Sequence, residues 1–176
     1  ATPPDDGAWA EYVAVRSDFV FPIPEEMSYE TGALLEPFSV GMHAMNRGEV
    51  TPGDRMLITG LGPIGLMAIQ AAQLYGVKEI FATDVVPNRL QLAEELGATV
   101  IDPAKDNVKE KIHELTGEKG IDIAIETSGN SSAVQDVLSI PKRGARVVLV
   151  GLPPVNEVGV NITHIVDSEY NIKGVF

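Results

Sequence analysis

The sequence predicts an α/β domain with a doubly wound, parallel sheet of six strands. Short apolar stretches alternate with single amphipathic helices from residue 54 onward. Strands separated by one helix pair in parallel, because each crossover must return to the same edge of the sheet. A glycine-rich turn joins the first of these strands to the first helix. Right-handed crossovers then place helices on both faces of the sheet.

The individual elements follow from the apolar periodicity. The strands are predicted at 54–60, 79–84, 99–101, 121–127, 145–151 and 171–176. The helices between them are predicted at 63–75, 88–96, 107–115 and 131–140. The 176 residues are enough for one such domain with a substantial buried core.

The chain before residue 54 is predicted to contain one strand and one helix. Residues 8–15 alternate apolar with small or polar side chains, as a half-buried strand does. Trp9 and Tyr12 lie in this stretch and are expected to pack in a core. Residues 30–47 carry a helical pattern, and Gly48 suits the position just past the end of that helix.

Composition argues against several classes of partner. The formal net charge is −12 and Lys and Arg form no cluster, which disfavours nucleic acid and an anionic membrane surface. No apolar run approaches the ~20 residues of a membrane span. The absence of cysteine excludes disulfides and Cys-ligated metal sites and fits a cytoplasmic location.

The glycine-rich turn has the pattern that a diphosphate requires. Residues 60–65 read Gly-Leu-Gly-Pro-Ile-Gly, directly after a predicted strand and directly before a predicted helix. Gly60 permits the sharp turn, Gly62 lets the backbone approach a pyrophosphate, and Gly65 lets the helix pack on the strand. Pro63 fits the first helical turn, where an amide has no intrahelical partner. The free amides and the helix dipole there attract an anion.

An acidic residue ends the second predicted strand. Asp84 follows Gly60 at close to the ~20-residue offset of a ribose-binding carboxylate. A carboxylate there accepts hydrogen bonds from the ribose hydroxyls and repels a 2′-phosphate, which favours NAD over NADP. Arg89 is interpreted as packing along the adenosine. The alternatives are a purely structural turn with Asp84 as a helix cap, or a site for a flavin or S-adenosylmethionine.

Four stretches resemble the sorbitol dehydrogenase group of the medium-chain, zinc-dependent dehydrogenases. They are A-T-P-P-D-D-G at 1–7, G-A-L-L-E-P-F-S-V-G-M-H-A at 32–44, G-P-I-G with T-D-x-x-x-x-R-L, and V-G-L-P with N-I-K-G-V-F at 150–153 and 171–176. The resemblance implies a Rossmann domain and reversible oxidation of a polyol secondary alcohol, sorbitol or xylitol, to a ketose. It also implies NAD as hydride carrier and zinc as a Lewis acid.

The resemblance also implies roles for individual residues. Ile64, Asp84 and Arg89 would contact NAD. Glu36 would face the zinc from a hinge helix. The residues expected near the nicotinamide end are Val150, Gly151, Leu152 and Phe176.

The remaining zinc ligands of such enzymes, a Cys and a His among them, belong to an N-terminal lobe that this sequence does not contain. The chain is therefore expected to be an inactive piece of a longer enzyme. Its expected parts are a remnant of the catalytic domain (1–30), the hinge helix (31–48) and the NAD-binding domain (49–176).

Two other functions stay open. The chain could be a nucleotide-binding module without catalysis, or the cofactor domain of another zinc alcohol or threonine dehydrogenase. A methyltransferase would instead bind S-adenosylmethionine.

The histidines and one apolar stretch complete the predictions. His43 is expected to be a packed helix residue, His113 a solvated one and His164 a structural one. Val158 to Ile162 alternates and is predicted to be an edge strand. An open apolar edge strand is an aggregation hazard. In the enzymes that this chain resembles, the corresponding segment pairs with its copy across a two-fold axis, so the resemblance implies a homo-oligomer.

Overall fold

The computed structural model describes residues 7–155 and 157–176. The first six residues, which belong to the resembling segment 1–7, lie outside that range. The chain divides into two compact units, Ala1–Leu34 and Leu35–Phe176. Helix α1 (Tyr29–Arg47) contains the boundary between them. Each unit is described separately.

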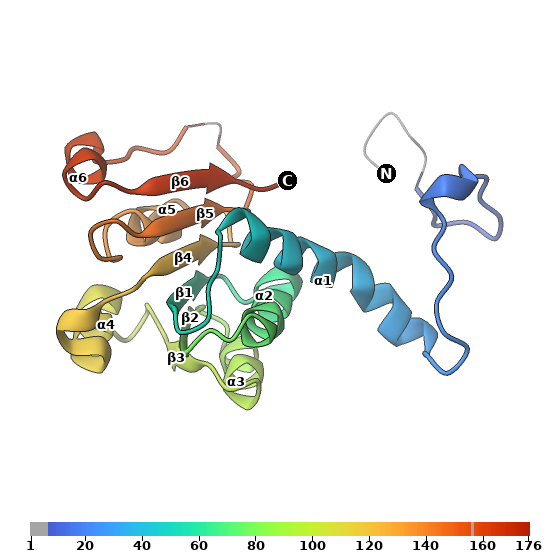
Figure 1. The fold of residues 1–176 in the computed structure, drawn as a ribbon, viewed down its shortest axis with the longest axis horizontal. Coiled ribbons are helices and arrows are strands. Elements are labelled where there is room, and N and C mark those ends of the chain that lie inside the picture. Colours follow the sequence, from blue (N-terminus) through green and yellow to red (C-terminus); the bar gives the residue numbers. More distant parts are fainter. Residues whose placement is uncertain (1–6, 156) are drawn as a thin grey trace. The chain divides into compact units, whose positions relative to one another are not determined.

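The larger unit is built on a six-stranded, all-parallel sheet with the strand order β3-β2-β1-β4-β5-β6 (Figure 1). The order reverses between β1 and β4, because β1 lies between β2 and β4. This confirms the predicted doubly wound α/β fold. The strands are β1 (Arg55–Thr59), β2 (Glu79–Thr83), β3 (Thr99–Ile101), β4 (Ile123–Glu126), β5 (Arg146–Leu149) and β6 (Asn171–Gly174).

Helices cover both faces of this sheet. Neighbouring strand residues point to opposite faces, so Met56 and Ile58 belong to one buried cluster and Leu57 to the other. The first cluster packs against α1, α2 and α3, and the second against α4, α5 and α6. The bounds are α2 (Pro63–Leu74), α3 (Pro87–Glu95), α4 (Val108–Thr116), η2 (Gly117–Lys119), α5 (Ser131–Val137) and α6 (Ile162–Asp167).

The segment after β5 differs from the prediction. The described residues 157–161 form no strand, and α6 begins at Ile162. The Asn161 side chain accepts a hydrogen bond from the His164 amide at 3.0 Å and so caps α6. In the single chain the alternating residues have no neighbouring strand, and Ile162 belongs to α6. Pairing of this segment with a second copy stays a prediction.

The smaller unit, as far as it is described, is mostly irregular. It contains the single-turn helix η1 (Ser17–Phe19) and the first residues of α1. Residues 8–15 form no strand, and the side chains of Trp9 and Tyr12 are fully exposed. The strand and core predictions for this stretch are wrong, because a strand needs a hydrogen-bonding partner that the described chain does not provide.

Arg146 joins β5 to the segment between α1 and β1 by an ion pair and a hydrogen bond. The Arg146 guanidinium lies 2.7 Å from the Asp54 carboxylate, which is almost fully buried. The same guanidinium donates a hydrogen bond to the Glu49 carbonyl at 2.5 Å. Arg146 therefore connects β5 to the two turns that precede β1.

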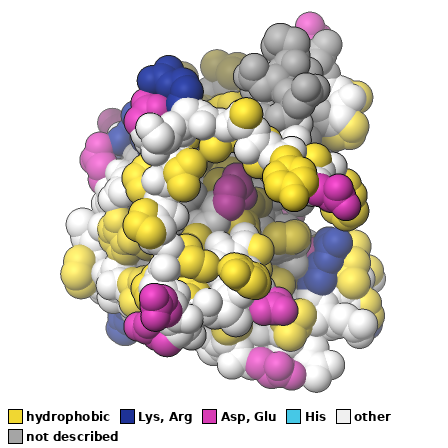
Figure 2. Space-filling model, turned by 90° about the vertical axis from the view of Figure 1, so that its right-hand side faces the viewer, with side chains coloured by type: hydrophobic (Ala, Val, Ile, Leu, Met, Phe, Trp, Pro, Cys, Tyr) yellow, Lys and Arg dark blue, Asp and Glu magenta, His cyan; other side chains and the backbone are white. Residues whose placement is uncertain are grey.

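The surface agrees with the acidic composition. In Figure 2, acidic side chains are spread over the face that is drawn, and basic side chains lie isolated between them. Within the described ranges, no helix is both long and apolar enough to cross a bilayer.

Candidate nucleotide-binding site

The candidate site lies at the carboxyl ends of β1, β2, β4 and β5. In a doubly wound sheet, the crevice forms where the strand order reverses, here between β1 and β4. The loops that leave these two strands therefore meet at one point. The predicted glycine-rich turn follows β1 directly.

The glycines of this turn occupy positions where larger side chains would collide. Gly60 has a φ of +86°, and an added Cβ would lie 2.6 Å from the Ser128 Cβ. A Cβ on Gly65 would overlap the Gly60 carbonyl oxygen at 1.9 Å. At Gly62, by contrast, an added Cβ would meet no atom within 4 Å. The turn is thus tight at both ends and open in the middle, where Gly62 precedes Pro63 at the start of α2.

Asp84 lies directly against this turn. Its carboxylate is buried and its Oδ2 atom accepts a hydrogen bond from the Leu61 amide at 2.7 Å. Its Oδ1 atom accepts one from the Val86 amide at 2.9 Å. The Arg89 guanidinium approaches Oδ2 to 3.5 Å. Each carboxylate oxygen has two lone pairs, so both oxygens keep acceptor capacity for a ligand hydroxyl.

A pocket of about 290 Å³ opens beside Asp84. Val85, Val86 and Pro103 give it apolar walls, and it also extends to the start of α5. Two carboxylates, those of Asp84 and Asp136, line it. Burial raises the pKa of Asp136 above its ordinary value. The pocket therefore combines apolar walls, as a flat ring system needs, with charged groups at its rim.

Thr127 and Glu126 hold the neighbouring loop, and the sequence reasoning missed both. The Thr127 hydroxyl donates a hydrogen bond to the Gly60 carbonyl at 2.7 Å. Glu126 is completely buried, and its carboxylate accepts hydrogen bonds from the amides of Ser128 at 2.7 Å and Gly129 at 3.0 Å. A carboxylate at the end of an otherwise apolar strand is the signal that marks Glu126.

The residues predicted for the nicotinamide end lie next to this loop. The amides of Val150 and Gly151 donate to the Glu126 carbonyl at 2.8 and 3.0 Å. A Cβ on Gly151 would lie 2.5 Å from the Glu126 carboxylate. The structure thus brings Val150 and Gly151 to the site, whereas the side chains of Leu152 and Phe176 are exposed.

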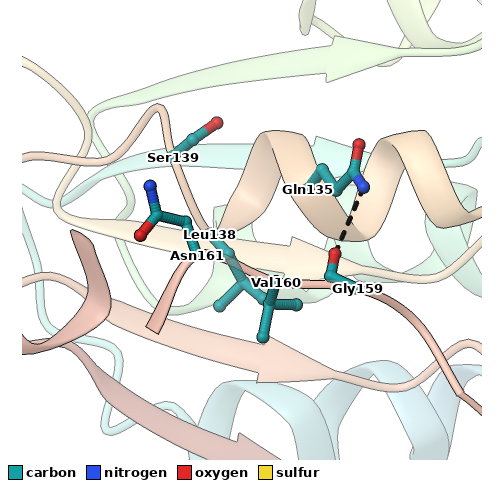
Figure 3. A pocket seen from close by; sticks show the side chains of 6 residues that line it. All are labelled: Gln135, Leu138, Ser139, Gly159, Val160 and Asn161. Carbon is teal, nitrogen blue, oxygen red and sulfur yellow. Dashed lines mark hydrogen bonds between the residues drawn. The ribbon is translucent and has the colours of Figure 1, made fainter. Parts of the chain in front are cut away.

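A second hollow of about 240 Å³ lies away from the glycine-rich turn (Figure 3). The Gln135 side chain donates a hydrogen bond to the Gly159 carbonyl across it at 3.2 Å (Figure 3). None of its lining residues carries a charge or belongs to the predicted nucleotide site. This hollow carries no sign of cofactor chemistry.

The residues considered for a metal site do not assemble one. Glu36 and His43 are both exposed on α1, so the prediction that His43 is packed is wrong. His113 is exposed as expected, and His164 lies edge-on to Tyr170 at 5.7 Å, a structural contact. Over the part of the chain that the structure describes, no three His, Cys, Asp or Glu residues lie together as metal ligands would. These residues alone therefore do not fit a zinc ion.

The fold and the glycine-rich turn place the protein in the Rossmann class of nucleotide-binding domains. The model of one family within this class, "Zinc-binding dehydrogenase", matches residues 63–176. The chain belongs to the zinc-binding dehydrogenases, as the sequence resemblance indicated.

Three similar proteins illustrate the relationship. Sorbitol dehydrogenase of Bacillus subtilis (strain 168) is 46% identical and aligns with 100% of this chain and 50% of its own length. (R,R)-butanediol dehydrogenase of the same organism is 37% identical over 96% of this chain and 49% of its own length. A solved alcohol dehydrogenase from Escherichia coli CFT073, complexed with NADH, is 27% identical, with a TM-score of 0.89 over 97% of this chain and 50% of its own. The chain spans about half the length of the curated relatives it matches.

Proposed function

We propose that this chain binds NAD(H) as the cofactor domain of a zinc-dependent polyol dehydrogenase. The observation that carries the proposal is the contact of the buried Asp84 carboxylate with the Leu61 amide, at 2.7 Å, inside the glycine-rich turn. This contact puts a ribose-binding group and a diphosphate-binding turn side by side. The sorbitol dehydrogenase relative at 46% identity supports the polyol as substrate class.

The diphosphate would lie over the open middle of the turn. Gly62 leaves the space above it free of side-chain atoms, and Ile64 and Gly65 follow in the first turn of α2. The amides at this helix start have no intrahelical partner and point toward the ligand. The positive end of the helix dipole adds to the attraction. The turn therefore holds the negative charge of the cofactor without a Lys or Arg.

The adenosine ribose would lie against Asp84. Its two hydroxyls donate hydrogen bonds to the carboxylate, and charged acceptors make such bonds stronger than neutral ones. A 2′-phosphate would meet the same carboxylate at close range and be repelled. Arg89, half-exposed beside Asp84, would cover the adenosine. The arrangement favours NAD over NADP.

The nicotinamide would extend toward β4 and β5. Val150 and Gly151 hold the backbone there close to Glu126, while the exposed Leu152 and Phe176 would contact the ring. These residues would hold the nicotinamide ring, and the cofactor, when bound, would supply reversible hydride transfer with the alcohol carbon. The part of this chain is to bind the cofactor and to keep the ring in one orientation.

The rest of the enzyme would complete the site. We assign residues 1–30 to the catalytic domain, 31–48 to a hinge helix and 49–176 to the NAD-binding domain. Glu36 would supply one zinc-facing carboxylate, and the other ligands would come from residues outside this sequence. We place the enzyme in the cytoplasm, with a polyol as substrate and no nucleic-acid or membrane partner. The stretch from Val158 to Ile162 would pair with a second copy.

A second candidate is a dehydrogenase for a smaller secondary alcohol. The butanediol dehydrogenase relative favours it, at 37% identity. The two candidates share the cofactor domain and differ in the lobe that contacts the alcohol. Steady-state kinetics of the full-length enzyme with sorbitol, xylitol and butanediol would separate them.

The cofactor assignment is tested by calorimetric titration of the chain with NADH and with S-adenosylmethionine. Saturable binding of NADH without binding of S-adenosylmethionine is the expected result. Binding of S-adenosylmethionine alone would reject the dehydrogenase assignment. Binding of neither would leave the glycine-rich turn as a structural element and reject the proposal for this chain.

A further inference from the structure

Asp136 is an acidic residue in the nucleotide pocket that no role yet explains. It belongs to α5 and lines the pocket opposite the end of β2, together with Asp84. Its carboxylate makes no hydrogen bond or ion pair with any residue in the described ranges. Partial burial reduces the solvation of this carboxylate and raises the pKa of Asp136. A bound ligand that donates a hydrogen bond would favour its charged form.

The part of the ligand that reaches Asp136 follows from the proposed function, on which this inference rests. With the diphosphate at the turn and the ribose at Asp84, the base must occupy the pocket beyond the ribose. Val85, Val86 and Pro103 line this space and suit the faces of a purine. Asp136 then lies at the edge of the base.

The chemistry of adenosine leaves one group for Asp136 to bind. The donors of adenosine are its ribose hydroxyls and its 6-amino group, while N1, N3 and N7 of the ring are acceptors. Asp84 takes the hydroxyls. Of the groups on the base, only the 6-amino group can therefore donate a hydrogen bond to a carboxylate at its edge.

We propose that Asp136 selects adenine as the base of the dinucleotide by accepting a hydrogen bond from its 6-amino group. Arg89 is the one cationic side chain among the described lining residues, and it lies beside Asp84 at 3.5 Å. Arg89 therefore lies beside the proposed ribose position and forms no ion pair with Asp136. Asp136 therefore has no protein donor among the described residues, and a ligand in the pocket can supply one. A base without the 6-amino group offers the carboxylate no donor at that position and binds more weakly.

The test compares NADH with its purine analogue, which carries a hydrogen in place of the 6-amino group and has the same net charge. Fluorescence titration gives the ratio of the two dissociation constants for the chain. The ratio cancels any effect of a variant on folding or on overall charge. We expect the chain to prefer NADH by on the order of tenfold, as a hydrogen bond to a charged acceptor provides.

Asp136→Ala is expected to bring this ratio close to one. Asp136→Asn keeps the size of the side chain and should lower the ratio less, because its neutral amide oxygen accepts a weaker hydrogen bond from the 6-amino group. Gln135→Ala, on the same helix but at the other hollow, should leave the ratio unchanged. A chain that binds both dinucleotides equally, or a ratio that survives undiminished in both Asp136 variants, would overturn the role of Asp136 and leave NADH binding intact. Failure to bind NADH at all would overturn the proposed function, and this inference with it.

Discussion

The Asp84 carboxylate accepts a hydrogen bond from the Leu61 amide at 2.7 Å, so the end of β2 is joined to the turn after β1. The two residues follow neighbouring parallel strands, whose carboxyl ends meet at the same edge of the sheet. One carboxylate therefore fixes the shape of the glycine-rich turn and faces the nucleotide pocket. In the proposed function, the shape of the turn and the recognition of the ribose depend on the same side chain.

The glycine-rich turn provides a matched pair of substitutions. Gly65→Ala should destabilise the fold by about 1–3 kcal/mol, because the new methyl group would overlap the Gly60 carbonyl. Gly62→Ala should leave stability nearly unchanged, because its methyl group would meet open space. The same methyl group would stand where the diphosphate approaches, so NADH affinity should fall. Denaturant unfolding and NADH titration measure the two effects. Equal loss of stability in both variants would contradict the geometry of the turn.

The Arg146–Asp54 pair should contribute to stability. Asp54 is almost fully buried, so Arg146→Met would leave a buried carboxylate without its cation. The expected loss in the free energy of unfolding is about 2–3 kcal/mol. Arg143→Met removes the exposed pair with Glu169 and should cost less than about 1 kcal/mol. Similar losses in urea unfolding for the two variants would show that burial of Asp54 does not determine the energy.

Asp122 should make stability depend on pH. Burial by itself would raise the pKa of Asp122, but hydrogen bonds from the Lys142 ammonium and the Arg55 amide outweigh it and lower the pKa. A carboxyl group whose pKa is lower in the folded state stabilises the fold at pH values above its pKa in the unfolded chain. That contribution is lost as the pH falls through the lowered pKa of Asp122 in the folded state.

The measurement is urea unfolding of the protein and of Asp122→Asn, from neutral pH down to the lowest pH at which both remain folded without urea. The difference in unfolding free energy should be present at neutral pH and shrink toward acid pH. Lys142→Met should weaken this pH dependence, because it removes one of the two donors. A difference that stays constant with pH would contradict the assignment to Asp122.

The sheet could be predicted from the sequence because its strands carry strong local signals. Each β strand lies within a predicted range, and β3 (Thr99–Ile101) matches its prediction residue for residue. A buried parallel strand is a short apolar run between turn residues, and such a run can be recognised without knowing which strands pair with it. The glycine-rich turn and Asp84 were readable for the same reason, since their spacing along the chain reflects one β-α-β unit.

The remaining parts depend on contacts that are distant in the sequence. The alternation at 8–15 resembles a strand but meets no partner in the described chain. Glu126 and Thr127 appeared to be the end of an ordinary strand, and their roles follow from the loops of β1 and β5 that fold against them. In the sequence, nothing distinguishes Asp136 from other carboxylates on helices. Only the fold shows that it lines the same pocket as Asp84.

The most direct test of the account is the ratio of NADPH to NADH dissociation constants in the protein and in Asp84→Ala. Calorimetric titration should show a strong preference for NADH in the protein, because the Asp84 carboxylate binds the ribose hydroxyls and repels a 2′-phosphate. In Asp84→Ala the affinity for NADH should fall and the preference should largely disappear. A preference for NADH that is unchanged in Asp84→Ala would contradict the placement of the ribose at the end of β2.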